Sequence, residues 1–357
     1  MTRTLAVRLD SDGDVLLTGP ALRALAAGSD HLTLLCGPRG LRAAELLPGV
    51  DALLVHRAPW IDPEPPPVDR DETMALVAHI AGLHVDAAVV FTSFHQSPLP
   101  TALLLRLAGV PTIAAICEDY PGSLLDVRHR DLPDHLHEVE RALSLAATLG
   151  HALPPGDRGG LAITAPSPPA VALPDPYIVV HPGTSVPARA WSPRRHAELV
   201  DALVAQGWPV VVTGGPDEAE LTAAVTGSPG RDGVHDLGAR TTLGELAGVL
   251  KGAAAVVVGN TGPAHLAAAV GTPVVSLFAP TVPAHRWRPY GVPTRLLYAE
   301  VPCAGCRAKV CPVSGHPCLD AGGPGQGVVV AQVLAALGDL LAGDVREPAL
   351  VEVQRSR

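Results

Sequence analysis

The sequence predicts an α/β protein made of two doubly wound parallel sheets. Short apolar segments alternate with helical patterns along almost the whole chain, which is the order of elements in such sheets. Residues 152–176, rich in proline and glycine, interrupt this alternation near the middle of the chain. The length of 357 residues fits two domains, each able to bury a core of its own.

The first half, residues 1–151, contains five predicted strands with helical patterns between them. The strands are rich in Val, Ile, Leu or Thr and lack polar alternation, as expected when helices cover both faces of a sheet. A further helix over 133–149 stops at Gly150, a residue type that often ends helices. The predicted strands are 5–9, 32–36, 52–56, 87–91 and 112–117, and the helices between them are 14–27, 41–47, 71–83 and 100–108.

The alternation restarts at residue 177 with a strand over 177–181. The next helix opens with Ser192 and Pro193, which suit the N-cap and the first helical position. We therefore expect a second Rossmann-like domain, with ligands at the carboxyl ends of the strands. The expected parts are a linker over 152–176, the second domain over 177–330, and a C-terminal helix and tail over 331–357. The other predicted strands of the second domain are 209–213, 234–237, 254–258 and 273–278, and its other helices begin at 217 or cover 243–251 and 263–270.

Composition excludes several classes of protein. A net charge of −9 argues against a nucleic-acid binder, and 47% hydrophobic residues argue against disorder. No segment has the 18 apolar residues of a membrane span, and the N-terminus does not resemble a secretory signal. We therefore expect a cytoplasmic protein with no transmembrane segment.

The turn over residues 259–265 suits a phosphate group. A strand ends at Gly259 and Asn260, Thr261 can cap the next helix, and Gly262 allows a close approach of the backbone. The free N–H groups of a helix N-terminus attract anions, and His265 can add a hydrogen bond or a positive charge. The alternative is an ordinary capped helix.

The turn over residues 181–191 also joins a strand to a helix. It carries Thr184, Ser185 and Arg189, and an arginine can clamp a phosphate through two hydrogen bonds. The alternative is a solvated loop with one surface arginine.

Two further turns place acids at helix starts. Asp217 and Glu218 follow a pair of glycines, and a carboxylate there can hold sugar hydroxyls. Asp14 follows Gly13 after the first strand, where a carboxylate can act as a general base. Acids at helix starts also simply complement the helix dipole, so both motifs have this alternative. No G-x-G-x-x-G follows a predicted strand, which disfavours a nicotinamide-dependent dehydrogenase.

Taken together, these stretches resemble glycosyltransferase family 9, the heptosyltransferase-like family, in the right order over nearly all of residues 4–320. The family's N-terminal motif matches residues 11–22, SDGDVLLTGPAL. Its C-terminal motifs match HPG at 181–183, RAWSP at 189–193, GGP at 214–216 and GNTGPAHLAAAVGTPV at 259–274.

The resemblance implies a GT-B fold, two Rossmann-like domains facing a deep cleft. It implies an inverting transfer that requires no metal, from a nucleotide-diphospho-sugar such as ADP-heptose to a glycan or glycolipid of the lipopolysaccharide-core type. Asp14 would be the base that deprotonates the acceptor hydroxyl. The residues implied to bind the donor are Thr184, Ser185, Arg189, Asp217 (or Glu218 in an equally good register), Asn260, Thr261, Gly262 and His265.

The chain departs from the family pattern at three places. Asn260 stands where the family has aspartate, which removes a negative charge beside the phosphates. Arg189 stands where the family usually has lysine, which keeps the charge but changes the geometry. Residues 92–97 and 118–130 match no acceptor motif, so the acceptor is left as a glycan or glycolipid, with peripheral membrane contact as one prospect.

Four cysteines, Cys303, Cys306, Cys311 and Cys318, fall within 16 residues and have metal-ligand character. We expect a structural role, either as a zinc site or as thiols that fix a loop. Disulfides are disfavoured in a reducing compartment, and an iron–sulfur cluster has no other support.

Three other functions compete with the transferase. They are a degenerate binder of nucleotide sugars without catalysis, an epimerase on a similar scaffold, and a metal-dependent interaction module built on the cysteine segment. Donor binding without turnover would identify the degenerate binder, and sugar conversion without an acceptor would identify the epimerase. Metal in the purified protein would identify the interaction module.

Overall fold

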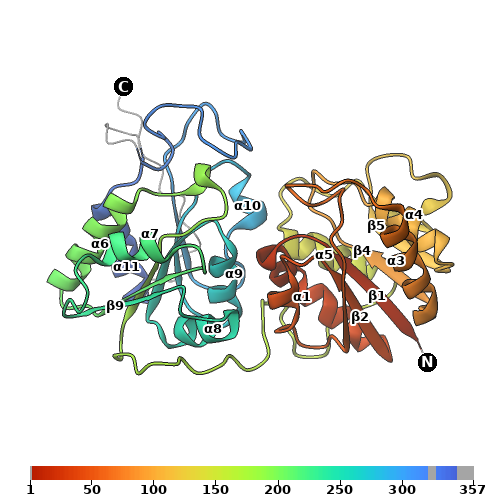
Figure 1. Cartoon of the computed structure of the whole chain (residues 1–357), viewed down its shortest axis with the longest axis horizontal. Coiled ribbons are helices and arrows are strands. Elements are labelled where there is room, and N and C mark those ends of the chain that lie inside the picture. Colours follow the sequence, from red (N-terminus) through yellow and green to blue (C-terminus); the bar gives the residue numbers. More distant parts are fainter. Residues whose placement is uncertain (1, 321–326, 344–357) are drawn as a thin grey trace. The chain divides into compact units, whose positions relative to one another are not determined.

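The computed structural model describes residues 2–320 and 327–343, so the predicted tail from residue 344 lies outside the described residues. The chain divides into two compact units, Met1–Thr164 and Ala165–Arg357, and the division falls inside segment 152–176. Each unit contains a six-stranded sheet whose paired strands are all parallel (Figure 1). The α/β prediction with two Rossmann-like, doubly wound domains is thereby confirmed.

The sheet of unit 1 has the strand order β3-β2-β1-β4-β5-β6, the order of a Rossmann fold. Its central strands are short runs of buried apolar residues, as the lack of polar alternation predicts. The strands are β1 Arg3–Arg8, β2 His31–Cys36, β3 Ala52–Val55, β4 Ala87–Val90, β5 Thr112–Ile116 and β6 Val127–His129.

Helices cover both faces of this sheet. Helices α3 and α4 pack on the face that carries Leu5 and Val7, whereas α1 packs with α5 and α2. The helices are α1 Asp12–Ala27, α2 Leu41–Ala44, α3 Arg70–Leu83, α4 Leu99–Leu107 and α5 Glu138–Ala147, with the 3-10 turn η1 Gly122–Leu124.

The sheet of unit 2 repeats this topology. Its order, β12-β11-β10-β7-β8-β9, is the Rossmann order read from the opposite edge. The strands are β7 Ile178–His181, β8 Val210–Gly214, β9 Val234–Gly238, β10 Ala255–Gly259, β11 Val274–Leu277 and β12 Thr294–Leu297.

Helices α6, α7 and α11 share a core with the face of this sheet that carries Ile178 and Val180, and α8 packs with α9. Ser192 caps α6 by accepting a hydrogen bond from the Arg195 backbone, as its position in the sequence predicts. The helices are α6 Pro193–Ala205, α7 Ala219–Thr226, α8 Leu243–Gly252, α9 Gly262–Ala269, α10 Ala284–Trp287 and α11 Val330–Leu341, with the 3-10 turn η2 Pro187–Arg189.

Several predicted boundaries are wrong. Strands β6 and β12 were not predicted, because three or four residues that include an arginine give no apolar run. Helix α5 begins at Glu138 instead of residue 133, because His137 and Glu140 form a capping box there. The helix predicted from Asp217 begins at Ala219. Within residues 2–320 and 327–343, no helix combines the length and the apolarity needed to cross a bilayer.

Candidate functional site

Apart from Asp217 and Glu218, which follow β8, the polar residues identified from the sequence follow the strands that flank the reversal of strand order in each sheet. In unit 1 the order reverses between β1 and β4, and in unit 2 between β7 and β10. Loops that leave neighbouring strands in opposite directions open a crevice at such a switch point, where Rossmann-like folds bind ligands. Each unit therefore carries one candidate site of its own.

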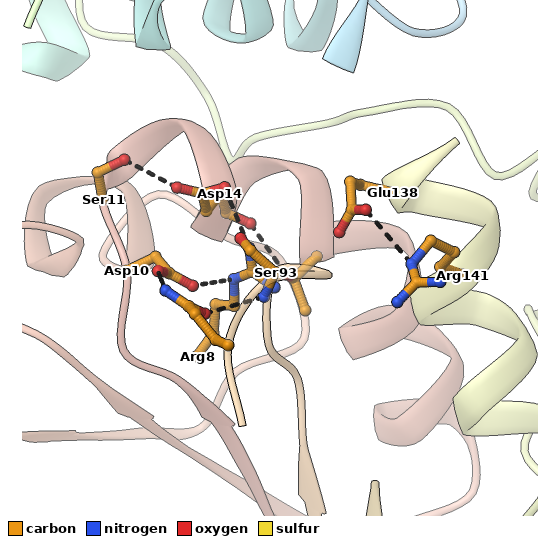
Figure 2. A network of polar contacts seen from close by, with 9 residues as sticks. Arg8, Asp10, Ser11, Asp14, Ser93, Glu138 and Arg141 are labelled. Atoms are coloured by element: carbon orange, nitrogen blue, oxygen red, sulfur yellow. Dashed lines mark hydrogen bonds and ion pairs between the residues drawn. The ribbon is translucent and has the colours of Figure 1, made fainter. Parts of the chain in front are cut away.

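The candidate site of unit 1 is organised by the guanidinium of Arg8, the last residue of β1 (Figure 2). Its Nη2 donates to Asp14 Oδ1 and to Ser93 Oγ, both at 3.0 Å. Its Nε forms an ion pair with Asp10 Oδ2, also at 3.0 Å. Since Ser93 follows β4, this one side chain bridges the switch point.

Asp14 lies in the first turn of α1, as predicted, and its side chain is 22% exposed. Its Oδ2 accepts a hydrogen bond from Ser11 Oγ at 3.0 Å. The neighbouring Asp12 has a different role, since Arg42 and the Ala43 backbone donate to its two carboxylate oxygens. Asp12 thus ties α1 to α2, whereas Asp14 is held by Arg8 and Ser11.

Burial and neighbouring charges act on the Arg8 cluster in opposite directions. Burial alone would lower the pKa of the Arg8 guanidinium, but the carboxylates of Asp10, Asp14 and Glu138 hold it above its usual value. Burial raises the pKa of the Asp10 carboxyl, against the attraction of Arg8. Asp10 is also fixed by Gln96, whose Nε2 donates to Asp10 Oδ1 at 2.5 Å.

The candidate site of unit 2 joins three loops through Arg189 in the turn after β7. Its Nε donates to Thr281 Oγ1 at 3.3 Å, and its Nη1 donates to the backbone oxygen of Asn260 at 3.5 Å. Asn260 follows β10 and Thr281 follows β11, so the cation lies beside the start of α9. The Asn260 side chain is buried, and its Nδ2 has no hydrogen-bond partner.

Helix α9 begins as predicted, with one difference in its cap. Thr261 is the N-cap residue, but its hydroxyl makes no capping hydrogen bond. The first N–H groups of α9 thus keep their capacity for an anion, which is the property a phosphate site needs. Gly262 opens the helix, and His265 is buried in its first turn.

Thr184 and Ser185 differ in their surroundings. Thr184 Oγ1 donates to the Val186 backbone at 3.0 Å, and its methyl group lies so close to Gly259 that a Cβ there would clash. Ser185 is exposed and lies in the same loop. The structure brings Thr184 to the switch point through its contact with the end of β10.

Of the two acids after β8, Glu218 is turned toward the loop that follows β7, whereas Asp217 is exposed. Glu218 Oε2 accepts from the Gly215 backbone at 2.6 Å and lies 3.9 Å from His181 Nε2. A Cβ on Gly183 would overlap this carboxylate, so a larger residue there would displace the Glu218 side chain. Burial lowers the pKa of His181 to about 4, against the attraction of Glu218, so this histidine is neutral at pH 7.

The cysteine segment packs against the Arg189 turn. The Ala188 backbone donates to the Lys309 oxygen at 3.0 Å, and His316 Nε2 lies 3.0 Å from the Ala188 oxygen. Arg307 in turn donates through its backbone to Thr281 at 3.0 Å. The segment therefore braces the backbone beside Arg189 and the Thr281 loop that holds its side chain.

The four cysteines line one cavity of about 20 Å³, room for about one water molecule. Burial raises the pKa of the Cys318 thiol to about 11, and the other three thiols add to the rise. Within the described ranges, no three His, Cys, Asp or Glu side chains stand in an arrangement that could hold a metal ion. The candidate zinc site stays a prediction.

Sequence reasoning assigned no role to Arg8, Asp10, Ser93 or Thr281. Arg8 and Asp10 stand directly before the predicted base, but a strand-end arginine gives no signal of the partners it will meet. Ser93 and Thr281 come from loops 79 and 267 residues after Asp14, and only the sheet order brings each to its switch point.

Comparisons with known proteins agree on one family. The sequence model of glycosyltransferase family 9 (heptosyltransferase) matches residues 93–316. Lipopolysaccharide heptosyltransferase 1 of Pseudomonas aeruginosa is 33% identical over 227 residues, 60% of this chain and 61% of that protein. The aligned part thus spans less than two thirds of this relative.

Two solved structures show the same fold. A family 9 glycosyl transferase from Veillonella parvula has a TM-score of 0.73 at 19% identity, covering 96% of this chain and 97% of that one. ADP-heptose lipopolysaccharide heptosyltransferase II of E. coli has a TM-score of 0.71 at 18% identity, covering 96% and 99%.

Proposed function

The chain belongs to glycosyltransferase family 9, and on this premise we propose that it transfers a heptose from ADP-heptose to a hydroxyl of a glycan or glycolipid. ADP-heptose and lipopolysaccharide are named for the relatives and structural neighbours, which supports this donor and an acceptor of that type. The observation that carries the proposal is the placement of Arg189 Nη1 beside Asn260, at the start of α9.

This arrangement suits a leaving diphosphate. As the bond to the anomeric carbon breaks, negative charge develops on the departing ADP, and stabilising that charge is the main electrostatic task of the enzyme. This charge is stabilised by the N–H groups of Thr261 and Gly262 at the start of α9, by the Arg189 guanidinium and by His265. Since these groups carry the positive charge, the proposed reaction needs no metal ion.

The acceptor is activated from unit 1. The Asp14 carboxylate removes the proton of the acceptor hydroxyl, and the resulting oxygen attacks the anomeric carbon from the face opposite to ADP. One such displacement inverts the anomeric configuration. Thr184, Ser185 and Glu218 or Asp217 complete the contacts to the phosphates and to hydroxyls of the donor.

A thermal-shift panel tests the donor. A ligand that binds only the folded state at 100 times its Kd stabilises it by about 2.7 kcal/mol. We expect ADP and ADP-heptose to raise the Tm more than UDP- or GDP-sugars. Equal or larger shifts with UDP- or GDP-sugars would contradict ADP-heptose as the donor.

An Asp14→Asn variant tests the chemistry. Transfer from ADP-heptose to lipopolysaccharide core acceptors is expected to be lost, while the affinity for ADP stays near that of the wild type. An active variant would overturn the assignment of the base. A wild-type protein that binds ADP-heptose without transferring or converting the sugar would instead indicate the degenerate binder.

A further inference from the structure

The guanidinium of Arg8 forms ion pairs with two carboxylates, those of Asp10 and Asp14. We propose that Arg8 is a positioning residue for Asp14, and that Asp10 takes up part of its charge so that Asp14 remains able to accept a proton. The inference rests on the proposed role of Asp14 and adds two residues that act through it.

The positioning step follows from the hydrogen bonds. Arg8 Nη2 donates to Asp14 Oδ1 and Ser93 Oγ, and Ser11 donates to Asp14 Oδ2 (Figure 2). Arg8 is 4% exposed and ends a central strand, so its fork is held rigidly by the sheet. These contacts to both carboxylate oxygens fix the orientation of the Asp14 side chain.

The charge step follows from the ion pairs. An arginine beside a single carboxylate typically lowers the carboxyl pKa by about 1 to 3 units, which would make Asp14 a weak base. Asp10 Oδ2 lies 3.0 Å from Arg8 Nε, as close as Asp14 Oδ1 lies to Nη2. The negative charge of Asp10 opposes the field of Arg8 at Asp14 and so restores part of the basicity.

Other charged groups lie near the cluster, and none of them changes the balance between Asp10 and Asp14 at Arg8. Glu138 of α5 adds a third negative charge near Arg8, and Arg141 pairs with it at 3.3 Å. Arg39, in the loop after β2, acts weakly on Asp10 and Asp12. Asp12 is paired with Arg42, as described above.

The competing explanation is purely structural, namely that Arg8 ties β1 to the loop after β4. Both explanations predict loss of activity when Arg8 is replaced, so activity alone does not separate them. They differ in whether the rate follows the titration of Asp14, because only the proposed roles make the acidic limb of the pH profile move with the Asp14 pKa when Arg8 or the Asp10 charge is removed.

The test measures that titration directly in the full-length protein. Aspartate labelled with 13C at the carboxyl carbon is followed by NMR against pH, and the Asp14 signal is assigned as the one lost in Asp14→Asn. We expect Arg8→Met to raise the Asp14 pKa by about one unit or more, since an adjacent cation is removed. Asp10→Asn, which keeps the shape of the side chain, should lower it.

Kinetics provide the second readout. The acidic limb of the pH profile of kcat/KM, measured with ADP-heptose and a core acceptor, should move with the Asp14 pKa in each variant. Arg8→Lys keeps the charge but loses the fork, so the limb should stay near its wild-type position while kcat falls at least tenfold. If Arg8→Met does not fold, Asp10→Asn and Arg8→Lys still decide the question.

The matched control is Arg23→Met, on the same helix α1 as Asp14. Arg23 forms a two-point pair with Asp157 at 2.6 and 3.0 Å and lies outside the cluster. It should change stability without moving the Asp14 titration. Unchanged or same-direction shifts in Arg8→Met and Asp10→Asn would overturn the inference. Activity in Asp14→Asn would overturn the proposed base instead, so the two failures are distinguishable.

Discussion

Arg189 donates through Nε to the hydroxyl of Thr281 at 3.3 Å, although 92 residues separate them in the chain. Thr281 is buried in the loop after β11 and thereby orients a cation that belongs to the turn after β7. The cysteine segment holds the backbone on both sides of this contact. The Arg189 cation of the proposed phosphate site is thus positioned by the loop after β11 and by the cysteine segment, neither of which was assigned to this site from the sequence.

Replacing Arg189 should weaken the binding of ADP. Hydrogen bonds to charged groups contribute about 1.5–3 kcal/mol, so we expect Arg189→Ala to raise the Kd for ADP at least tenfold in calorimetry. Arg189→Lys keeps the charge but loses the contact to Thr281, so its Kd for ADP should lie between those of the wild type and Arg189→Ala. Arg194→Ala, which removes an exposed pair with Glu198, serves as the control. Equal Kd values for Arg189→Ala and this control would remove Arg189 from the site.

The two acids after β8 can be separated by the same measurement. Glu218 faces the loop after β7 and Asp217 is exposed. We therefore expect Glu218→Gln to raise the Kd for ADP about five- to tenfold and Asp217→Asn to leave it unchanged. A larger effect at Asp217 would assign the contact to donor hydroxyls to the other register.

The fold could be predicted from the sequence because the central strands of each sheet are buried on both faces and therefore form apolar runs. What failed were the elements without that signal, such as β6 and β12. The turn motifs were placed correctly because helix caps and glycines act locally. Thr261 was located as an N-cap residue, for example, although its hydroxyl does not make the expected capping bond.

The contacts that organise the candidate site of each unit could not be predicted, because they depend on strand order. Ser93 meets Arg8 only because β4 lies beside β1, and Thr281 meets Arg189 because β11 follows β10 in the sheet. Sequence spacing also left Asp217 and Glu218 equivalent. Their separation came from the close approach of Gly183 to one of the two carboxylates.

Metal analysis separates the two roles predicted for the cysteine segment, a zinc site or thiols that fix a loop. The four thiols line a space of about 20 Å³, but within the described ranges no three of them are arranged to hold a metal ion, so zinc would bind only if the thiols moved together. Because the pKa of Cys318 is about 11, binding must displace protons and should weaken as the pH falls. Elemental analysis of protein purified under reducing conditions checks this, with Cys303→Ser/Cys306→Ser as the metal-free control. Protein without metal would leave the thiols with the bracing role alone.

His316 should support the donor site from that same segment. Its Nε2 contacts the Ala188 oxygen, next to Arg189, at 3.0 Å. Removing the ring in His316→Ala loosens this turn, so we expect the Kd for ADP to rise about threefold with little change in the Tm. His285→Gln, at an exposed histidine of the same unit, is the matched control. An unchanged Kd in His316→Ala would show that the brace does not matter for binding.

Two buried histidines should make unit 2 sensitive to acid. Burial lowers the pKa of His181 to about 4 and that of His196 to about 3, both below the value of about 6.5 in an unfolded chain. Above pH 6.5 both residues are neutral in either state and contribute no pH dependence. Below pH 6.5 the histidines bind protons in the unfolded state but not in the folded state. The free energy of unfolding therefore decreases as the pH is lowered, until the pH reaches the pKa of the folded state.

The size of this loss can be measured. At about 1.4 kcal/mol per pH unit and histidine, each should cost about 2 kcal/mol between pH 6.5 and pH 5. His196→Gln removes one of the two groups, so its free energy of unfolding in urea should fall by about 2 kcal/mol less than that of the wild type. The carboxylates are common to both proteins, and their contributions cancel in the comparison. If both proteins lose the same stability between pH 7 and pH 5, His196 is not held neutral by burial.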